Sequence, residues 1–242
     1  MAWMGVANVN QRRLLRGSYL SDIWTAPHSA TKHRLFLVCA VYLSLLVFGA
    51  ISTRSQTVVT FDDLPVNGTG RVPLFYQGLE WQQFDYVNAV LNTNVTGGVN
   101  GYYFGMVSAS NVAFNSMGTS GLISSPNLAT TFDFLSVYLT GAWNSNLNIL
   151  IFGYNNSTEL YNTTVVVSAT SPTLFTFDYR NINRLIFNTA GGQPAGFSSG
   201  SGFEFAMDNF TYVLVPEPSS LLLTVLGFAT LWAFLGHGRH TG

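Results

Sequence analysis

Four residues near the two ends of the central sequence have side chains that could bind a metal ion. Asp62 and Asp63 are adjacent early in the chain, and Asp208 and Asn209 are adjacent late in it. Carboxylate and carbonyl oxygens are the hard ligands that calcium prefers. If the two strands that carry these pairs are neighbours, the four residues form a structural calcium site. The alternative is that the acids are solvated or cap turns.

The segments around these pairs also carry a resemblance. Residues 60–63 (TFDD) and 207–210 (MDNF) resemble the terminal strands of carbohydrate-binding jelly rolls that hold a structural calcium. The resemblance implies that the first and last strands of the domain lie close together.

Large aromatic residues with neighbouring polar groups could bind a carbohydrate. Sugar rings stack on aromatic faces, and their hydroxyls bond to amides and carboxylates. Trp81, Tyr86 and Trp143 are the candidate ligand-binding residues, and residues 78–86 (GLEWQQFDY), which lack regular alternation, favour a loop or a short edge strand. The alternative is that these aromatics belong to the core, which is where a β-sandwich more often places them.

The central segment lacks the residues of most hydrolytic mechanisms. Residues 57–215 contain no histidine and no cysteine, because His28, His33, His237, His240 and Cys39 all lie outside it. Nucleophilic triads and zinc sites therefore drop out. A glycosidase with a pair of catalytic carboxylates is still compatible with the residue types present. Its candidate acids are Glu80, Asp85, Glu159 and Glu204. Since any two acids meet this criterion, we predict a non-enzyme with no catalytic residues.

The charge of the central segment excludes one class of partner. Between Thr57 and Val215 there are three arginines, no lysine and nine carboxylates, so the formal charge is −6. Binding of nucleic acid needs clustered lysine and arginine to neutralise phosphates. Nucleic acid is therefore not an expected partner.

Short apolar segments that alternate with turn signals should position these residues. The expected strands are residues 57–64, 101–107, 132–140, 147–154, 160–168, 173–179, 184–188 and 203–214. Turn signals separate them, among them Asn155-Asn156 and Gly191-Gly192. No stretch between them shows a sustained helical repeat with caps. The pattern predicts one all-β domain over 57–215, an antiparallel β-sandwich of the jelly-roll kind.

The last expected strand changes its apolar phase. Phe203, Phe205 and Met207 share one face, whereas Phe210 and Tyr212 belong to the opposite phase. A two-residue period cannot do this without a slip. We therefore predict a β-bulge near Asp208 and Asn209.

The N-terminal 52 residues resemble an extension followed by a signal peptide. Lys32 and Arg34 precede the apolar run 35–50 (LFLVCAVYLSLLVFGA), which has the length of a signal-peptide core. Ala50 and Ser52 stand at the small-residue positions that signal peptidase reads. The alternative is an uncleaved membrane anchor.

The C-terminal segment 216–242 resembles a PEP-CTERM sorting signal, the bacterial tail of Pro-Glu-Pro, hydrophobic helix and basic cluster. Pro216, Glu217 and Pro218 form the motif, residues 221–235 (LLLTVLGFATLWAFL) form the apolar run, and Arg239 stands where the family usually has several arginines. The resemblance implies transit through the inner membrane and recognition by an exosortase-type enzyme. The alternative is a plain C-terminal anchor.

Together these features predict an exported, non-catalytic protein. The expected course is a membrane-anchored precursor that becomes a cell-surface or extracellular component associated with exopolysaccharide. The alternative is a carbohydrate-binding module with an aromatic platform.

Overall fold

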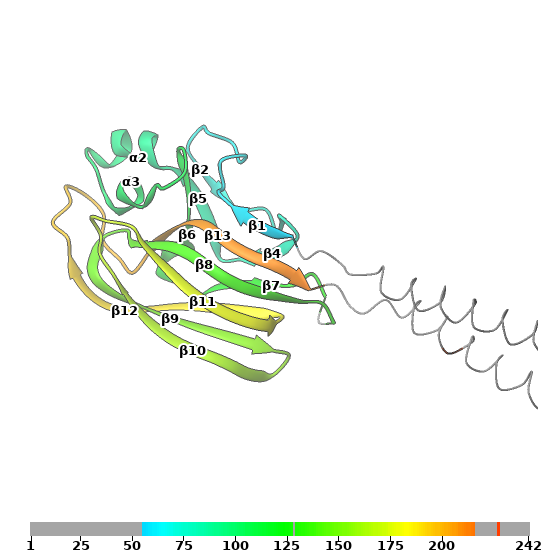
Figure 1. Cartoon of the computed structure of the whole chain (residues 1–242). Helices are drawn as coiled ribbons and strands as arrows, with labels where there is room; N and C mark the ends of the chain where they lie inside the picture. Colours follow the sequence, from blue (N-terminus) through cyan, green and yellow to red (C-terminus); the bar gives the residue numbers. More distant parts are fainter. Residues whose placement is uncertain (1–54, 128, 216–226, 228–242) are drawn as a thin grey trace, which may run out of the picture. The chain divides into compact units, whose positions relative to one another are not determined.

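The computed structural model describes residues 55–127, 129–215 and 227. These residues form two antiparallel β-sheets packed face to face (Figure 1). The prediction of an all-β sandwich is confirmed at this level. Both predicted apolar end segments, 35–50 and 221–235, and the motif Pro216-Glu217-Pro218 fall outside the described residues, apart from Gly227.

Sheet A is the seven-stranded sheet of the described part of the chain. Its spatial order is β11 (Thr173–Ile182), β8 (Thr131–Gly141), β13 (Phe205–Val215), β6 (Asn111–Asn115), β5 (Phe84–Asn88) and β2 (Thr69–Arg71), and β1 (Gln56–Val59) also pairs with β13. The first and last strands are thus neighbours, as the sequence implied, with Gln56 opposite Val213.

Sheet B has six strands within the described residues. Their order is β10 (Thr158–Val167), β9 (Asn144–Asn155), β12 (Arg184–Pro194), β7 (Gly121–Ser124), β4 (Leu79–Gln82) and β3 (Phe75–Tyr76). The predicted turn at Gly191-Gly192 is wrong, since both glycines lie inside β12 with positive φ.

The core lies between the sheets and is rich in aromatic rings. Alternate residues of each strand point inward, which places one apolar set from each sheet in the interior. The fully buried rings come from strands of both sheets and from the segment after β1: Phe61, Phe84, Phe132, Phe134, Phe187, Phe205, Phe210 and Tyr212. The phenyl rings of Phe134 and Phe210 stack with centroids 4.9 Å apart.

Two short helices, which the sequence analysis did not predict, connect β5 to β6. They are α2 (Ala89–Thr96) and α3 (Gly101–Gly105), and a single 3₁₀ turn follows β6 at Ser116–Gly118. The expected strand over 101–107 is therefore wrong. The Asn88 side chain accepts a hydrogen bond from the backbone N–H of Leu91 at 3.0 Å, and Asn100 caps α3 in the same way. These caps satisfy N–H groups that have no intrahelical partner.

The predicted bulge in the last strand is confirmed. The pairing of β13 with β8 shifts register between Asp208 and Thr211, and Asn209 has φ of 50°. Because of the slip, Met207 and Phe210 both point into the core.

No helix within the described residues is long and apolar enough to span a membrane.

Candidate functional site

The structure places two of the three predicted platform residues in the interior. Trp81 is 2% exposed, its indole N–H donates to the Tyr76 carbonyl at 3.0 Å, and its ring meets that of Phe210 edge-on. Tyr86 is also buried. Neither ring face is available to a sugar, so the prediction that they bind a ligand is wrong. The cause is alternation along β4 and β5, which turns Trp81 toward the core.

Trp143 lies elsewhere, beside the two helices. Its ring is half-buried and packs edge-on against Tyr102 of α3 at 5.4 Å, with Gly200 directly against it. Any carbon side chain at position 200 would collide with the indole, so the loop 195–204 rests on this ring. The three aromatics therefore do not form one surface.

The three carboxylates of the predicted calcium site accept hydrogen bonds from protein donors and do not form one group, whereas the Oδ1 of Asn209 is buried without a hydrogen-bond partner among the described residues. The carboxylate of Asp63 accepts hydrogen bonds from Tyr76 and Gln77, whereas Asp62 accepts one from the backbone N–H of Asn111 at 3.1 Å. Within the described residues there is no group of three acidic, histidine or cysteine side chains able to hold a metal.

Asp208 is instead a fully buried structural carboxylate. One oxygen accepts the backbone N–H groups of Val107 and Ser108, both at 2.7 Å, and the other accepts the Ser108 hydroxyl at 2.8 Å and the N–H of Asn209 at 2.7 Å. Burial raises the pKa of Asp208, and these four donors oppose that shift. Since both oxygens already accept two donors, the arrangement does not fit a calcium ligand. It fixes the loop after α3 to the bulge of β13.

The outer face of sheet B carries the polar surface that the core aromatics do not provide. In β9 the residues Ile149 and Ile151 point into the core, so Leu150, Phe152 and Tyr154 point outward and stay partly exposed. The same alternation applies to the neighbouring strands. Residues at paired positions therefore form rows that cross the sheet from β4 to β10.

Two adjacent rows define this surface, which we call the outer face of sheet B. The apolar row consists of Gln82, Leu122, Ile186, Phe152 and Asn162. The charged row consists of Glu80, Ser124, Arg184, Tyr154 and Glu159. All ten side chains are exposed or half-buried.

Arg184 stands at the centre of the charged row. Its guanidinium carbon lies 4.7 Å from the ring centroid of Tyr154, a cation–π contact, and its Nη2 donates to the Asn156 carbonyl at 3.2 Å. The Tyr154 hydroxyl donates to Glu159 at 3.2 Å. Desolvation raises the pKa of Tyr154, and the hydrogen bond to Glu159 adds to that shift. These contacts hold the guanidinium in one orientation on the sheet.

A cavity of about 180 Å³ adjoins the charged row. It is lined by Glu80, Ser124, Ser125, Pro126, Asn127, Asn156, Asn183 and Arg184. Hydroxyl, amide and charged groups thus meet in one depression. The half-buried rings of Phe152 and Tyr154 lie on the same face of the sheet. This combination suits a ligand that has many hydroxyl groups.

Glu80 and Glu159 do not form a glycosidase pair. They occupy opposite ends of the charged row, four interstrand spacings apart, which is about 19 Å at about 4.8 Å per spacing. Paired carboxylates in glycosidases lie about 5 to 10 Å apart. The other two candidate acids, Asp85 and Glu204, lie on and before strands of sheet A.

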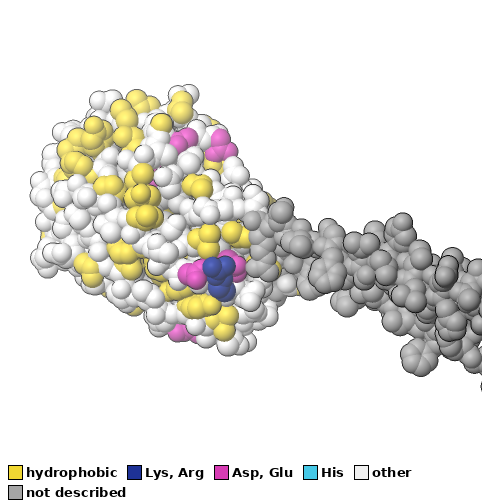
Figure 2. Space-filling model, viewed as in Figure 1, with side chains coloured by type: hydrophobic (Ala, Val, Ile, Leu, Met, Phe, Trp, Pro, Cys, Tyr) yellow, Lys and Arg dark blue, Asp and Glu magenta, His cyan; other side chains and the backbone are white. Residues whose placement is uncertain are grey.

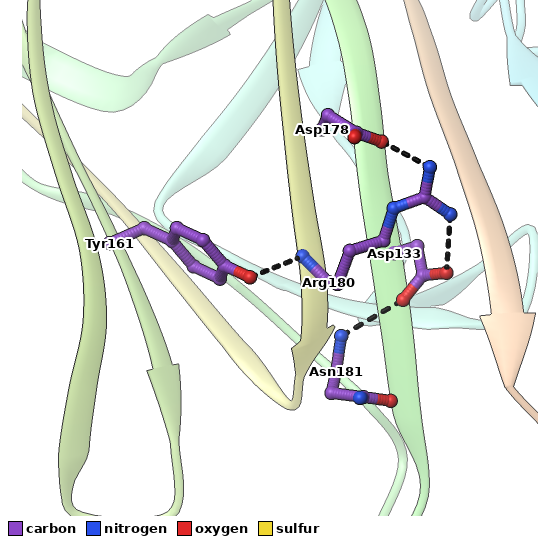
Figure 3. A network of polar contacts seen from close by, with 5 residues as sticks. All are labelled: Asp133, Tyr161, Asp178, Arg180 and Asn181. Carbon is purple, nitrogen blue, oxygen red and sulfur yellow. Dashed lines mark hydrogen bonds and ion pairs between the residues drawn. The ribbon is translucent and has the colours of Figure 1, made fainter.

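A second charged cluster lies at the side of the sandwich where β10 contacts β11. In Figure 2 basic side chains lie between acidic side chains over β11. Arg180 is paired with Asp178 and with Asp133, the latter at 3.2 Å, and its backbone N–H donates to the Tyr161 hydroxyl at 3.1 Å (Figure 3). The Tyr161 ring stacks on Tyr179 with centroids 4.4 Å apart. The cluster joins the two sheets, so its arginine is already committed to the fold.

The sequence contains a signal for the outer face of sheet B. The expected strands 147–154 and 184–188 each alternate, which puts Phe152 and Tyr154 in one phase and Arg184 in the exposed phase of its strand. Tryptophan content alone does not identify this face, because Trp81 lies in the core. The pairing of β9 with β12 could not be read from the sequence.

No protein-family model matches the chain, and no curated protein matches it. Among solved structures, the chain is similar to a DUF4465 family protein from Bacteroides ovatus, with 10% identity and a TM-score of 0.39 over 68% of this chain and 95% of the other. It is similar to a family 29 carbohydrate-binding module from Piromyces equi, with 13% identity and a TM-score of 0.34 over 67% and 91%. A family 11 carbohydrate-binding module of a Clostridium thermocellum cellulase gives 12% identity and 0.33 over 69% and 99%. These values are too low to transfer what those proteins bind.

Proposed function

We propose that this protein is a non-catalytic, exported β-sandwich that binds polysaccharide on the outer face of sheet B. The observation that carries the proposal is the charged row, in which Arg184 is held on Tyr154 beside a cavity of about 180 Å³ lined by serine and asparagine side chains. This face offers hydrogen-bonding groups and partly exposed rings together.

The chemistry of the face matches what sugars present. The Asn127 carboxamide oxygen already accepts hydrogen bonds from residues 129 and 130, so its Nδ2 group provides donors for a ligand, and Glu80 provides acceptors only. Phe152 and Tyr154 add apolar surface for the C–H face of a sugar ring. Binding by such groups needs no nucleophile, which agrees with a segment that has no histidine or cysteine.

The proposed export and cell-surface localisation rest on the two ends of the sequence. In this proposal the sandwich is a jelly roll that carries a signal helix before it and a hydrophobic helix after it. Signal peptidase acts near Ser52, and an exosortase-type enzyme acts at Pro216-Glu217-Pro218. The start of β1 and the end of β13 lie at the same end of the sandwich, which suits a chain handled from one membrane surface (Figure 1).

A glycan array tests the binding function. The whole chain, purified in detergent, should bind at least one polysaccharide, and Tyr154→Ala should reduce that binding at least tenfold because it removes the support of Arg184. The matched control is Tyr138→Ala on the outer face of sheet A, which should leave binding unchanged. Absence of binding to every glycan, or equal loss in both variants, would contradict the proposal.

Mass spectrometry of the exported protein tests whether the C-terminal segment is removed during export. We expect a mature C-terminus near Pro218 in the source organism, and a Pro216→Ala, Pro218→Ala double variant should keep its tail. Recovery of the wild-type chain with residues 221–235 still attached would favour a plain anchor instead.

A further inference from the structure

The three arginines of the described residues differ in how their charge is balanced. Arg180 is paired with two carboxylates, and Arg71 lies 4.0 Å from Asp85 with a side chain that is 72% exposed. Arg184 has no carboxylate within 4.0 Å among the described residues. In a segment without lysine, it is the cation on the outer face of sheet B that lacks a counter-ion.

The hydrogen bonding of Arg184 is also incomplete. Its Nη2 donates to the Asn156 carbonyl, its Nε is buried without an acceptor, and no other acceptor for the guanidinium lies within the described residues. A partly desolvated cation without a counter-ion is unfavourable, and a planar guanidinium pairs best with a group that has two oxygens.

The carboxylates of the same row are already engaged by neutral donors. Glu80 accepts from the amide of Gln82 at 2.8 Å and from the hydroxyl of Ser124 at 3.3 Å. Glu159 accepts from Tyr154 at 3.2 Å. The row therefore supplies Arg184 with neighbours but not with a salt bridge, and Arg184 is one of the residues that line the cavity.

From this arrangement we propose that the ligand of the outer face of sheet B is an acidic polysaccharide, whose uronic acid carboxylate pairs with Arg184. The inference rests on the proposed function and names its ligand class. A carboxylate matches the guanidinium fork, whereas the sugar hydroxyls match Ser124 and Asn127 in the same cavity. The formal charge of −6 on residues 57–215 acts weakly at a distance, because charges are screened beyond about 8 Å at physiological ionic strength.

The test compares polysaccharides that differ only in charge. Binding of the whole chain in detergent is measured by calorimetry to polygalacturonate and to alginate, each beside its fully methyl-esterified form. We expect about 10- to 100-fold tighter binding to the acid than to the ester, the worth of one charged hydrogen-bonded pair. Dextran and dextran sulfate form a second pair, and preference for the sulfate without binding of the uronates would overturn the proposal.

Three variants locate the effect. Arg184→Gln should abolish the difference between acid and ester, whereas Arg71→Gln, which makes the same change in net charge, should keep it. Glu80→Gln should tighten binding of the acid severalfold, because it removes the negative charge among the residues that line the cavity. This opposite sign remains measurable even if Arg184→Gln fails to fold.

The outcomes separate the two proposals. Equal binding of acid and ester, reduced by Tyr154→Ala, would overturn the uronate inference and leave polysaccharide binding intact. Equal loss in Arg71→Gln and Arg184→Gln would assign the effect to net charge and would also overturn it. Failure to bind any of these polymers or any glycan of the array would overturn the proposed function itself.

Discussion

The outer faces of the two sheets are built for different tasks. On sheet A, α3 packs against β8 and β13, and Tyr102, Val112 and Ala206 form a small second core that is at most 5% exposed. On sheet B, Leu150 and Ile186 remain half-buried at the surface. Covering one face adds buried apolar area, whereas the bare face keeps groups available to a ligand.

The helix α3, which covers part of the outer face of sheet A and is called the cover below, lies very close to the backbone at the end of β8. The N–H of Gly101 donates to the Ala142 carbonyl at 2.9 Å, and an added Cβ on Gly101 would lie 1.8 Å from the Gly141 carbonyl oxygen. At Gly105 the same atom would lie 2.8 Å from the Cβ of Ala206. Substitutions at the covered face should therefore cost stability, and substitutions at the bare face should cost binding.

The largest effect should come from Asp208→Asn. The amide cannot accept all four hydrogen bonds, so buried N–H groups of the loop after α3 lose their partner, and we expect the free energy of unfolding to fall by about 4 kcal/mol. Urea unfolding measures it, with Asp178→Asn as the control, since that carboxylate is 62% exposed. A similar small change in both variants would show that Asp208 does not hold the cover in place.

Gly101→Ala should have the next largest effect. Alanine normally stabilises a helix relative to glycine. Here its methyl group would displace α3 from the strand end, so we expect a loss of about 3 kcal/mol. Thermal unfolding checks the sign, and a gain in melting temperature would mean that the cover tolerates more space than the contacts indicate.

Phe152→Ala, on the outer face of sheet B, should reduce binding more than it reduces stability. Its ring is half-exposed on sheet B, so we expect a change of about 1 kcal/mol in stability, together with a loss of polysaccharide binding of at least tenfold. Both quantities are measured on the same preparation. A large loss of stability without any loss of binding would reverse the roles assigned to the two faces.

A pH-dependent effect on stability is expected at Glu204, which directly precedes β13. Burial raises its pKa, and its Oε2 has no hydrogen-bond partner within the described residues. A carboxyl whose pKa is raised on folding contributes stability below its unfolded pKa and loses it as pH rises through the folded value. Glu204→Gln should therefore raise the melting temperature slightly at pH 7 and leave it unchanged at pH 4. Equal shifts at both pH values would assign the effect to packing.

Removal of divalent metal should have the smallest effect. Since the carboxylates of Asp62, Asp63 and Asp208 accept hydrogen bonds from protein donors, a chelator should leave the melting temperature unchanged. A clear decrease, restored by calcium, would revive a metal site between the first and last strands.

The strands that the sequence predicted best are those with long, regular alternation. Residues 173–179 and 147–154 fall within β11 and β9, and the phase change after Met207 located the bulge. Both signals depend only on which face meets the core. Local pattern therefore sufficed for these elements.

The incorrect predictions concern residues whose position depends on tertiary contacts. Residues 101–107 are apolar enough for a strand, but Asn100 caps a helix that covers sheet A. Residues 78–86 were expected to form a loop or a short edge strand, but burial alternates along β4 and places Trp81 in the core. Arg184 and Tyr154 are 30 residues apart, and only the pairing of β12 with β9 brings them together. Both the packing of α3 on sheet A and the charged row depend on contacts between residues that are far apart in the sequence.

The pairing of β1 with β13 gives the sandwich a mechanical asymmetry. β13 runs through the middle of sheet A and is paired with β8 from Phe205 to Val215, so a pull on its C-terminal end would load many ladder bonds in shear. β1 has four residues and pairs only with β13, so a pull on its N-terminal end would load far fewer ladder bonds. A sandwich tethered through its C-terminus would therefore resist a pulling force better than one tethered through its N-terminus.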